Sequence, residues 1–321
     1  MTEVAKTVCT AYEVRKTRKQ KEAFRAYLCQ ELEKLGYAPR VESRRSLVTS
    51  HNVVAGDPEK AKVLFTAHYD TCAVLPFPNF ITPRNLFVFL FYQLAISALF
   101  LILAVAVEVA LLLVFEPPLW VQMLVVYAFL VFCIWWMLAG KANRRTANDN
   151  TSGVAALLEI AAALPPECRD TVCFVWFDNE EKGLFGSSAF AAAHRRVKAD
   201  TLMLNFDCVG DGDHLQFFPS KTVKKSAEIM ALLETSFPSQ GQKTVEIVRG
   251  FGLYPSDQAV LRRGVGVAAL KKAPVIGYYM GRIHTRHDTV LEEENVQLLC
   301  RGAVRLAGTL KEQKDGVHHA G

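Results

Sequence analysis

The chain has 321 residues, of which 51% are hydrophobic, and a formal net charge of +5. This length suits one large α/β domain or two smaller ones, and the apolar content suffices for a core. Basic residues are not interleaved with aromatic ones in any nucleic-acid-binding motif, so we expect no nucleic-acid partner. The eight cysteines include no C-x-x-C pair, and the charged N-terminal stretch lacks the apolar run of a signal peptide. We therefore expect reduced thiols in a cytosolic setting.

The first part of the chain is predicted to alternate helices and strands. Residues 17–35 place apolar side chains near one helical face, and Gly36 is a suitable helix stop. Strands are predicted at residues 41–44, 47–54 and 62–66, the last of which is a buried apolar run that leads into His68.

Residues 86–140 are the most apolar part of the chain. Leu86–Val107 and Leu119–Gly140 are uncharged stretches of 22 residues each, and about 20 apolar residues suffice to cross a bilayer. A tight break at residues 116–118 lies between the two apolar runs, which predicts a transmembrane hairpin with both outer ends on one side. The alternative is a pair of buried helices in a soluble core, but a run such as residues 87–92 has no polar stripe.

Flanking charge predicts the orientation of this hairpin. Arg84 precedes the first span, and Lys141, Arg144 and Arg145 follow the second, whereas the turn holds only Glu116. The positive-inside rule then places both flanking segments in the cytoplasm. We therefore expect a cell-membrane protein that contacts the lipid bilayer through residues 86–140.

Strands and helices alternate again after the hairpin. Helices are predicted at residues 152–164, 189–196, 223–237 and 292–312, and strands at residues 170–177, 201–206, 265–270 and 274–278. This alternation predicts an α/β fold with a mostly parallel mixed sheet sandwiched between helices. The hairpin, residues 84–141, would be an insertion that divides one α/β domain into residues 1–83 and 142–321.

Five short acidic or histidine-containing motifs follow one another along the chain: His68–Asp70, Asp149–Asn150, Glu180–Glu181, Asp207 and His284–Thr289. Most of the first four lie at or just beyond the end of a predicted strand, where open α/β sheets gather their active-site groups. His68 and Asp70 share one face of an extended strand, so the imidazole can bind a metal ion while the carboxylate orients it. Glu180 and Glu181 repel each other, and a metal ion is one reason to hold them together, one as ligand and the other as base.

Each motif also has a structural explanation. Asp149 is placed to cap a helix, the acidic pair suits a solvated loop, and Asp207 suits a turn before Gly210. Cys72 and Cys208 lie beside motif residues and could approach a metal ion, but they are expected to be small buried side chains. In series, however, the five motifs predict the ligand set of a two-metal hydrolase.

These motifs resemble the zinc peptidase family that contains secreted bacterial leucyl aminopeptidases, glutamate carboxypeptidase and the related glutaminyl cyclases. The matching signatures are Ala67–Asp70, Ala147–Gly153, Phe177–Ser187, Asn205–Asp207, Ser256–Asp257 and Ile283–Thr289. The resemblance spans roughly residues 20–310 apart from the apolar insertion, which is foreign to the secreted aminopeptidases.

The resemblance implies a site with two zinc ions, although carboxylate-rich sites also accept manganese or cobalt. The implied ligands are Asp149 as the bridge, Glu181 and His284 at one ion, and His68 and Asp207 at the other. Glu180 would be the general base that takes a proton from the attacking water, and Asp70 would orient His68. His287 falls on a variable position of the motif and is not expected to be a ligand.

The resemblance favours a membrane-anchored aminopeptidase that removes N-terminal residues from peptide substrates. Carboxypeptidases and dipeptidases share the ligand set. A single-zinc acyltransferase like the glutaminyl cyclases and a non-catalytic receptor or scaffold are the alternatives, but the filled ligand positions favour hydrolysis. Residues 250–257 and 277–283 are expected to form loops that set specificity, and the sequence carries no signal for an oligomeric state.

Overall fold

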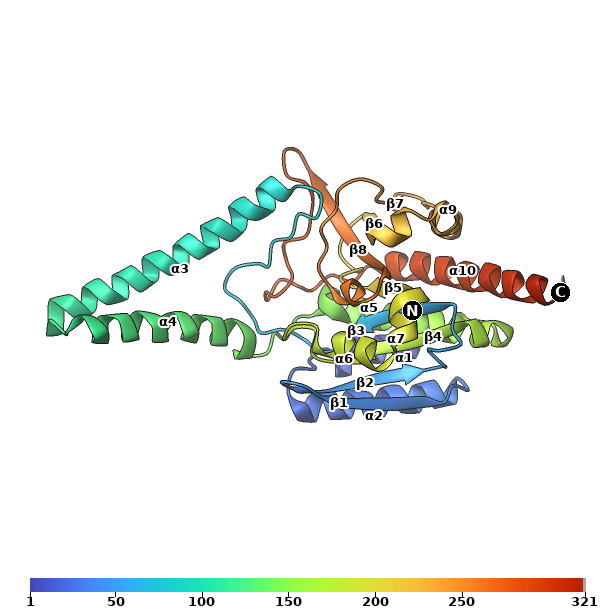
Figure 1. Ribbon diagram of the computed structural model, residues 1–321, viewed down its shortest axis with the longest axis horizontal. Helices are drawn as coiled ribbons and strands as arrows, with labels where there is room; N and C mark the ends of the chain where they lie inside the picture. Colours follow the sequence, from blue (N-terminus) through green and yellow to red (C-terminus); the bar gives the residue numbers. More distant parts are fainter. Residues whose placement is uncertain (320–321) are drawn as a thin grey trace.

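A mixed β-sheet forms the centre of the computed structural model, which describes residues 1–319 (Figure 1). Within that range the sheet has nine strands in the order β1-β2-β4-β3-β5-β8-β6-β7, with β9 paired to β8. The strands are β1 (Pro39–Arg45), β2 (Thr49–Ala55), β3 (Val63–His68), β4 (Val172–Phe177), β5 (Leu202–Phe206), β6 (His214–Pro219), β7 (Thr244–Ile247), β8 (Arg263–Ala273) and β9 (Gly277–Tyr279).

The centre of the sheet is parallel and its flanks are partly antiparallel. Strands β4, β3, β5 and β8 run parallel, while β1, β2, β6 and β9 pair antiparallel with neighbours. Every residue of β3, β4 and β5 is buried, as expected for parallel strands covered on both faces. The predicted α/β fold with a mixed sheet between helices is confirmed.

Helices cover both faces of the sheet. They are α1 (Glu3–Ala11), α2 (Arg18–Lys34), α5 (Gly153–Ala163), α6 (Phe185–Ala193), α7 (Arg195–Asp200), α8 (Lys221–Lys224), α9 (Ala227–Ser236) and α10 (Glu293–His319). In β4, Phe174 and Trp176 pack in one core with α1, α2, α5, α9 and α10. Val175 and Phe177 point to the opposite face, where they pack with α6 and α7, as the two-residue period of a strand requires.

Local signals account for most element boundaries. Thr17 forms a capping box with Gln20 at the start of α2, so the helix predicted at residues 17–35 is confirmed. The helix predicted at residues 189–196 is interrupted at His194, whose φ of −112° and ψ of 68° are not helical. The helix predicted at 223–237 is likewise replaced by α8 and α9, because Ser226 caps a new helix.

Other predictions about the sheet and the N-terminus were wrong at one strand and missed three elements. The strand predicted at residues 274–278 begins only at Gly277, because Pro274 has no N–H to donate and Val275 has a φ of 67°. Helix α1 and strands β6 and β7 were not predicted. The tight turn at residues 274–276 instead folds β9 back on β8.

Helices α3 (Leu86–Phe115) and α4 (Leu119–Ala139) both project from the sheet body (Figure 1). They meet at the end of the hairpin that is farthest from the sheet. Both are long and apolar enough to cross a membrane. Only Ala104 in α3 and Cys133 in α4 are buried. The pair is therefore not packed inside the α/β body.

A buried ion pair ties α2 to the strands beside it. Lys21 Nζ lies 2.6 Å from Asp178 Oδ1, and the two side chains are 9% and 1% exposed. The other Asp178 oxygen accepts the backbone N–H of His51 in β2 at 3.0 Å. This contact holds the end of β4, from which Glu180 and Glu181 follow.

We expect Lys21→Met to destabilise the fold by roughly 3–5 kcal/mol, because it leaves the Asp178 carboxylate buried without a cation. Thermal unfolding in detergent should show a Tm lower by roughly 10 °C for a chain of this size. Lys34→Met is the matched control, since Lys34 is 59% exposed and pairs with Glu31 on the same helix; its effect should stay below about 1 kcal/mol. Equal losses in both variants would contradict this account.

Candidate metal centre

The carboxyl ends of three neighbouring parallel strands bring the first ligand candidates together. His68 is the last residue of β3, and Asp207 directly follows β5. The acidic pair Glu180 and Glu181 follows β4 after two residues. Because β3 lies between β4 and β5 in the sheet, these side chains meet at one edge.

The remaining two ligand candidates, Asp149 and His284, lie outside the strands. Asp149 belongs to the turn η1 (Ala147–Ser152), which precedes α5, and His284 belongs to the segment after β9. One oxygen of Asp149 lies 3.4 Å from His68 Nε2, and the other lies 3.0 Å from His284 Nε2. The Asp149 carboxylate therefore stands between the two imidazoles and faces each with a different oxygen.

The distances around this carboxylate suit zinc. His68 Nε2 is 3.4 Å from both Asp149 Oδ1 and Asp207 Oδ1, and His284 Nε2 is 3.4 Å from Glu181 Oε2. These separations exceed ordinary hydrogen-bond lengths. Ligands bonded at 2.0–2.1 Å to a tetrahedral zinc ion are about 3.3–3.4 Å apart, so these three pairs of atoms have the spacing that such an ion requires. The fourth pair, His284 Nε2 and Asp149 Oδ2, is closer, at the hydrogen-bond distance of 3.0 Å.

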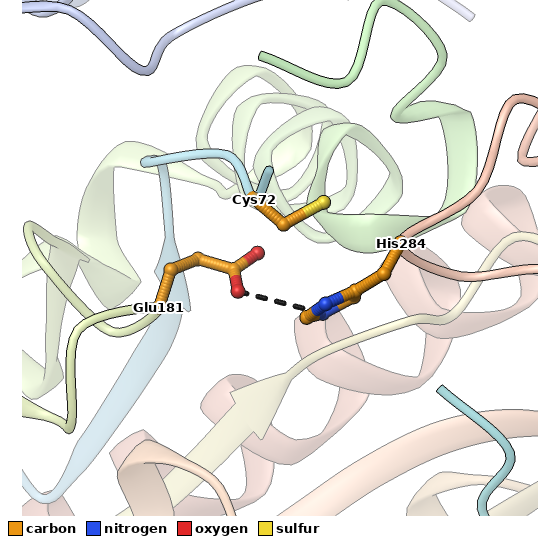
Figure 2. Close-up of side chains that lie close together, drawn as sticks. All are labelled: Cys72, Glu181 and His284. Atoms are coloured by element: carbon orange, nitrogen blue, oxygen red, sulfur yellow. Dashed lines mark ion pairs between the residues drawn. The ribbon is translucent and has the colours of Figure 1, made fainter. Parts of the chain in front are cut away.

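Glu181, His284 and Cys72 converge beside the edge of the sheet (Figure 2). Each offers a ligand atom, and these atoms lie within 4.8 Å of one another. Burial raises the pKa of the Cys72 thiol well above its usual value, and the charges of Glu181 and Asp149 raise it further. Both effects favour the protonated thiol, and the side chain is buried, as expected from the sequence.

Burial and crowding of carboxylates dominate the electrostatics. Burial raises the pKa of both Glu180 and Glu181 well above the usual value, and nearby carboxylates reinforce the shift. Burial alone would lower the pKa of His68, but Glu180, Asp149 and other neighbouring carboxylates outweigh it and raise that pKa. The site therefore holds more negative charge than its own histidines balance, a condition that a bound cation relieves.

The residues fit a zinc site in both chemistry and geometry. Imidazole nitrogens and carboxylate oxygens are ordinary zinc ligands, and the side chains of His68, Asp149 and Asp207 are 1%, 6% and 9% exposed. The Oε1 atom of Glu181 is buried without a hydrogen-bond partner among the described residues. A buried carboxylate oxygen that no donor satisfies is costly unless a cation binds it, which is consistent with a metal ion at Glu181.

The sequence profile of peptidase family M28 matches residues 136–300. The chain belongs to peptidase family M28. This confirms the resemblance to zinc peptidases that the motifs indicate. The matched range begins near the end of α4, so His68 and Asp70 lie before it, on the other side of the insertion. Among curated proteins, none matches the chain by sequence.

Solved structures of glutaminyl cyclases and of exopeptidases share the M28 fold of this chain. Porphyromonas gingivalis glutaminyl cyclase superposes with a TM-score of 0.61 at 16% identity, covering 97% of this chain and 98% of that one. A Zn-dependent exopeptidase from Parabacteroides distasonis gives 0.58 at 17% identity, covering 95% and 94%. The LapA aminopeptidase of Legionella pneumophila gives 0.56 at 15% identity, covering 95% and 69%.

The predicted positioning residue Asp70 contacts the acidic pair of this M28 chain. Its carboxylate accepts the backbone N–H groups of Glu180 at 2.9 Å and Glu181 at 3.3 Å. The same carboxylate lies 3.7 Å from His68 Nδ1, and the backbone oxygen of Asp70 lies 3.1 Å from that nitrogen. Asp70 thus links the His68 strand end to the loop that carries the acidic pair.

The side chain of Asn150 joins the Asp149 turn to the end of β5 and to the backbone oxygen of His68, 3.4 Å from its Nδ2, a role that the sequence did not indicate. Its Nδ2 donates to the backbone oxygen of Phe206 at 3.0 Å, and its Oδ1 accepts the N–H of Cys208 at 3.2 Å. Gly153 is needed beside it, because an added Cβ there would lie 2.2 Å from the Phe206 oxygen. The Asp149 turn is therefore bonded directly to the end of β5.

Asp288 supports Asp149 from the other side. One Asp288 oxygen accepts the N–H of Asn148 at 2.7 Å and the other accepts the N–H of Asp149 at 3.0 Å. Asp288 is buried, whereas its neighbour His287 is exposed. The only sequence signal for this role was the position of Asp288 in the His284–Thr289 motif.

Two buried ionisable residues near the site received no role from the sequence, although Asp257 belongs to one of the matching signatures. Arg15 is fully buried, and its guanidinium donates to the backbone oxygen of Tyr69 at 2.5 Å and to Thr151 Oγ1 at 3.2 Å. Burial lowers its pKa to about 10, so it stays charged at neutral pH and offsets part of the negative charge. Burial raises the pKa of Asp257 to about 7, and His68 counteracts this shift.

The ligand candidates line a pocket of about 150 Å³. Tyr254 and Pro255 from the expected loop 250–257 and Ile283 from the expected loop 277–283 form part of its wall. Tyr254 also donates its hydroxyl to the backbone oxygen of Asp207 at 3.0 Å. Both expected segments therefore border the candidate metal centre, although residues 277–279 form β9 and not a loop.

We expect Asp288→Ala to weaken zinc binding by roughly 10- to 100-fold, the usual cost of losing a group that positions a ligand. The measurement is competition with a chelator of known affinity, on protein whose folding is checked by its Tm with saturating zinc. His287→Ala is the control, because that side chain is exposed in the same motif, and its zinc affinity should be unchanged. Wild-type affinity in Asp288→Ala would show that the two backbone contacts do not position Asp149.

Proposed function

We propose that this chain is a membrane-anchored di-zinc aminopeptidase that hydrolyses N-terminal peptide bonds. The observation that carries the proposal is the Asp149 carboxylate, whose two oxygens face His68 and His284 separately. That arrangement supports a bridging ligand between two ions. The proposed ligands are His68 and Asp207 at one ion, Glu181 and His284 at the other, and Asp149 at both.

The residues of the chain supply the proton chemistry. Zinc at such a site lowers the pKa of water and polarises a carbonyl group. Glu180 lines the pocket. Burial and the neighbouring carboxylates raise its pKa above the usual value, while the charge of His68 counteracts this shift, and a carboxylate with a raised pKa is a stronger base. Glu180 takes a proton from water as the water oxygen attacks the carbonyl carbon. It then delivers that proton to the amine nitrogen as the C–N bond breaks.

A glutaminyl-cyclase-like acyltransferase is the second candidate. The Porphyromonas gingivalis glutaminyl cyclase covers this chain as fully as the exopeptidases do. Such an enzyme, expected to work with one zinc ion, would not need both His68 with Asp207 and His284 with Glu181. The presence of both pairs at tetrahedral spacing favours hydrolysis.

We expect the full chain, purified in detergent, to bind two zinc ions and to release p-nitroaniline from aminoacyl-p-nitroanilides. Glu180→Gln should keep both ions but lose activity by roughly 10²- to 10⁴-fold, because the amide cannot accept the proton. Metal content per chain and kcat/KM for both proteins are the measurements.

Two other results would each reject the proposed activity. One zinc ion per chain with cyclisation of N-terminal glutamine peptides and no nitroanilide release would identify the acyltransferase. Full activity in Glu180→Gln would show that another group is the base.

We further propose that α3 and α4 cross the cell membrane and that residues 1–83 and 142–321 form one catalytic domain on the cytoplasmic side. The two helices have almost no buried side chains, which a lipid environment would cover. The basic residues Arg84, Lys141, Arg144 and Arg145 flank their outer ends, in the pattern that favours the cytoplasmic side.

We expect a cysteine at the turn to be reachable only from outside the cell. In intact cells, a membrane-impermeant maleimide should label Glu116→Cys, whereas Arg144→Cys should be labelled only after permeabilisation. Both positions are exposed, and the wild-type chain with its half-buried Cys9, Cys29 and Cys300 is the background control. The reverse labelling pattern would place the catalytic domain outside, and labelling of both variants in intact cells would contradict a membrane-spanning hairpin.

A further inference from the structure

A second cavity, of about 180 Å³, adjoins the candidate metal centre. Asn79, Glu181 and His284 line both this cavity and the pocket that holds the ligand candidates. The second cavity therefore lies directly beside any group bound at Glu181 and His284.

The far wall of this cavity comes from the two apolar helices. Tyr92, Gln93 and Ile96 contribute from α3, and Met137 and Leu138 contribute from α4. The three α3 residues are half-buried, whereas the adjacent Leu94 is 69% exposed. The inserted hairpin is thus part of the wall beside the metal centre.

The near wall is also mostly apolar. It comes from the segment between β3 and α3, through Ala73, Leu75, Phe77 and Pro78. The hydroxyl of Tyr92 is already donated to the backbone oxygen of Pro78 at 2.5 Å. Among the lining residues Glu181 is the only carboxylate, and there is no lysine or arginine, so the cavity favours an uncharged, apolar occupant.

The cavity lies level with one end of the apolar hairpin. Ile96 in α3 and Leu138 in α4 are separated by the same number of residues from the turn that joins the helices. At 1.5 Å per residue both positions lie roughly 30 Å along the helices from that turn, which is about the thickness of a bilayer's hydrocarbon core. In Figure 1 the helices separate toward this end, where they face the sheet body.

We propose that this cavity is the subsite for a large apolar side chain at the reacting end of a peptide substrate. The inference rests on the proposed peptidase function, because it places the reacting bond at Glu181 and His284. A cavity of about 150 Å³ in another protein holds a benzene ring, so the volume suits a phenylalanine or leucine side chain. The hairpin is then a specificity element of the enzyme as well as its anchor.

The test measures binding rather than turnover. The full chain in lipid nanodiscs, loaded with zinc, is titrated calorimetrically with the hydroxamates of phenylalanine, leucine, glycine and lysine. We expect the phenylalanine and leucine compounds to bind at least tenfold more tightly than the glycine compound, as expected for transfer of such side chains out of water. The lysine hydroxamate should bind no more tightly than the glycine hydroxamate.

Ile96→Trp fills the cavity from α3. It should abolish the preference for the phenylalanine and leucine hydroxamates, while its affinity for the glycine hydroxamate should stay within threefold of the wild-type value. Met137→Trp fills it from α4 and provides a second variant if the first does not fold. Leu94→Trp is the matched control, since Leu94 is exposed on the same helix, and it should keep the full preference. Zinc content is measured in every variant.

Equal affinities for all four hydroxamates in the wild type, or a preference that survives both filling substitutions, would overturn the subsite. The hydroxamate-binding test of the subsite can fail or succeed independently of the nitroanilide test of the proposed function. A chain that shows the apolar preference and its loss in Ile96→Trp, yet hydrolyses no nitroanilide, would retain the subsite and reject the aminopeptidase.

Discussion

Crowding of carboxylates at the buried carboxyl edge of β4, β3 and β5 is the constraint on which the rest of the structure depends. Asp149, Glu181 and Asp207 lie within a few ångströms of two imidazoles, with Glu180 and Asp257 nearby. Charges of one sign repel strongly where water is excluded. Arg15 offsets part of that repulsion, and bound zinc would offset the rest. The raised pKa values of the two glutamates express the same imbalance.

A network of hydrogen bonds holds these charges in place. Asp70 fixes the backbone of the acidic pair, Asn150 joins the Asp149 turn to β5, and Asp288 binds the backbone of Asp149 itself. Each of these side chains spans two or more segments that are distant in the sequence. Loops placed on a rigid sheet can thus hold ligand atoms at the separations that zinc needs, which loops alone would not maintain.

The position of the insertion explains why the proposed membrane anchor and the proposed specificity wall can be one element. Helices α3 and α4 lie in the connection that leaves β3 after His68 and returns at Asp149. This connection starts and ends at the carboxyl edge of the sheet, where the ligand candidates are. An insertion there leaves the strand pairing of β3 with β4 and β5 intact. It also places any protruding helices beside the site, so the cavity between Glu181 and Leu138 is a consequence of topology.

The sequence by itself determined the α/β alternation, the two apolar spans and the ordered motifs, because periodicity, chain breaks and polar residues after strands are local features. The same local features predict His68 and Asp207 at or beside strand ends, where both are found. The resemblance implied that Asp149 bridges two ions, but only the tertiary structure gave the distances of its oxygens from the two imidazoles. Only the tertiary structure decided that Asp288 supports Asp149 and that Arg15 is buried near the site. It also decided that the hairpin walls a cavity next to Glu181. These relations depend on contacts between segments far apart in the chain, for which a single sequence has no local signal.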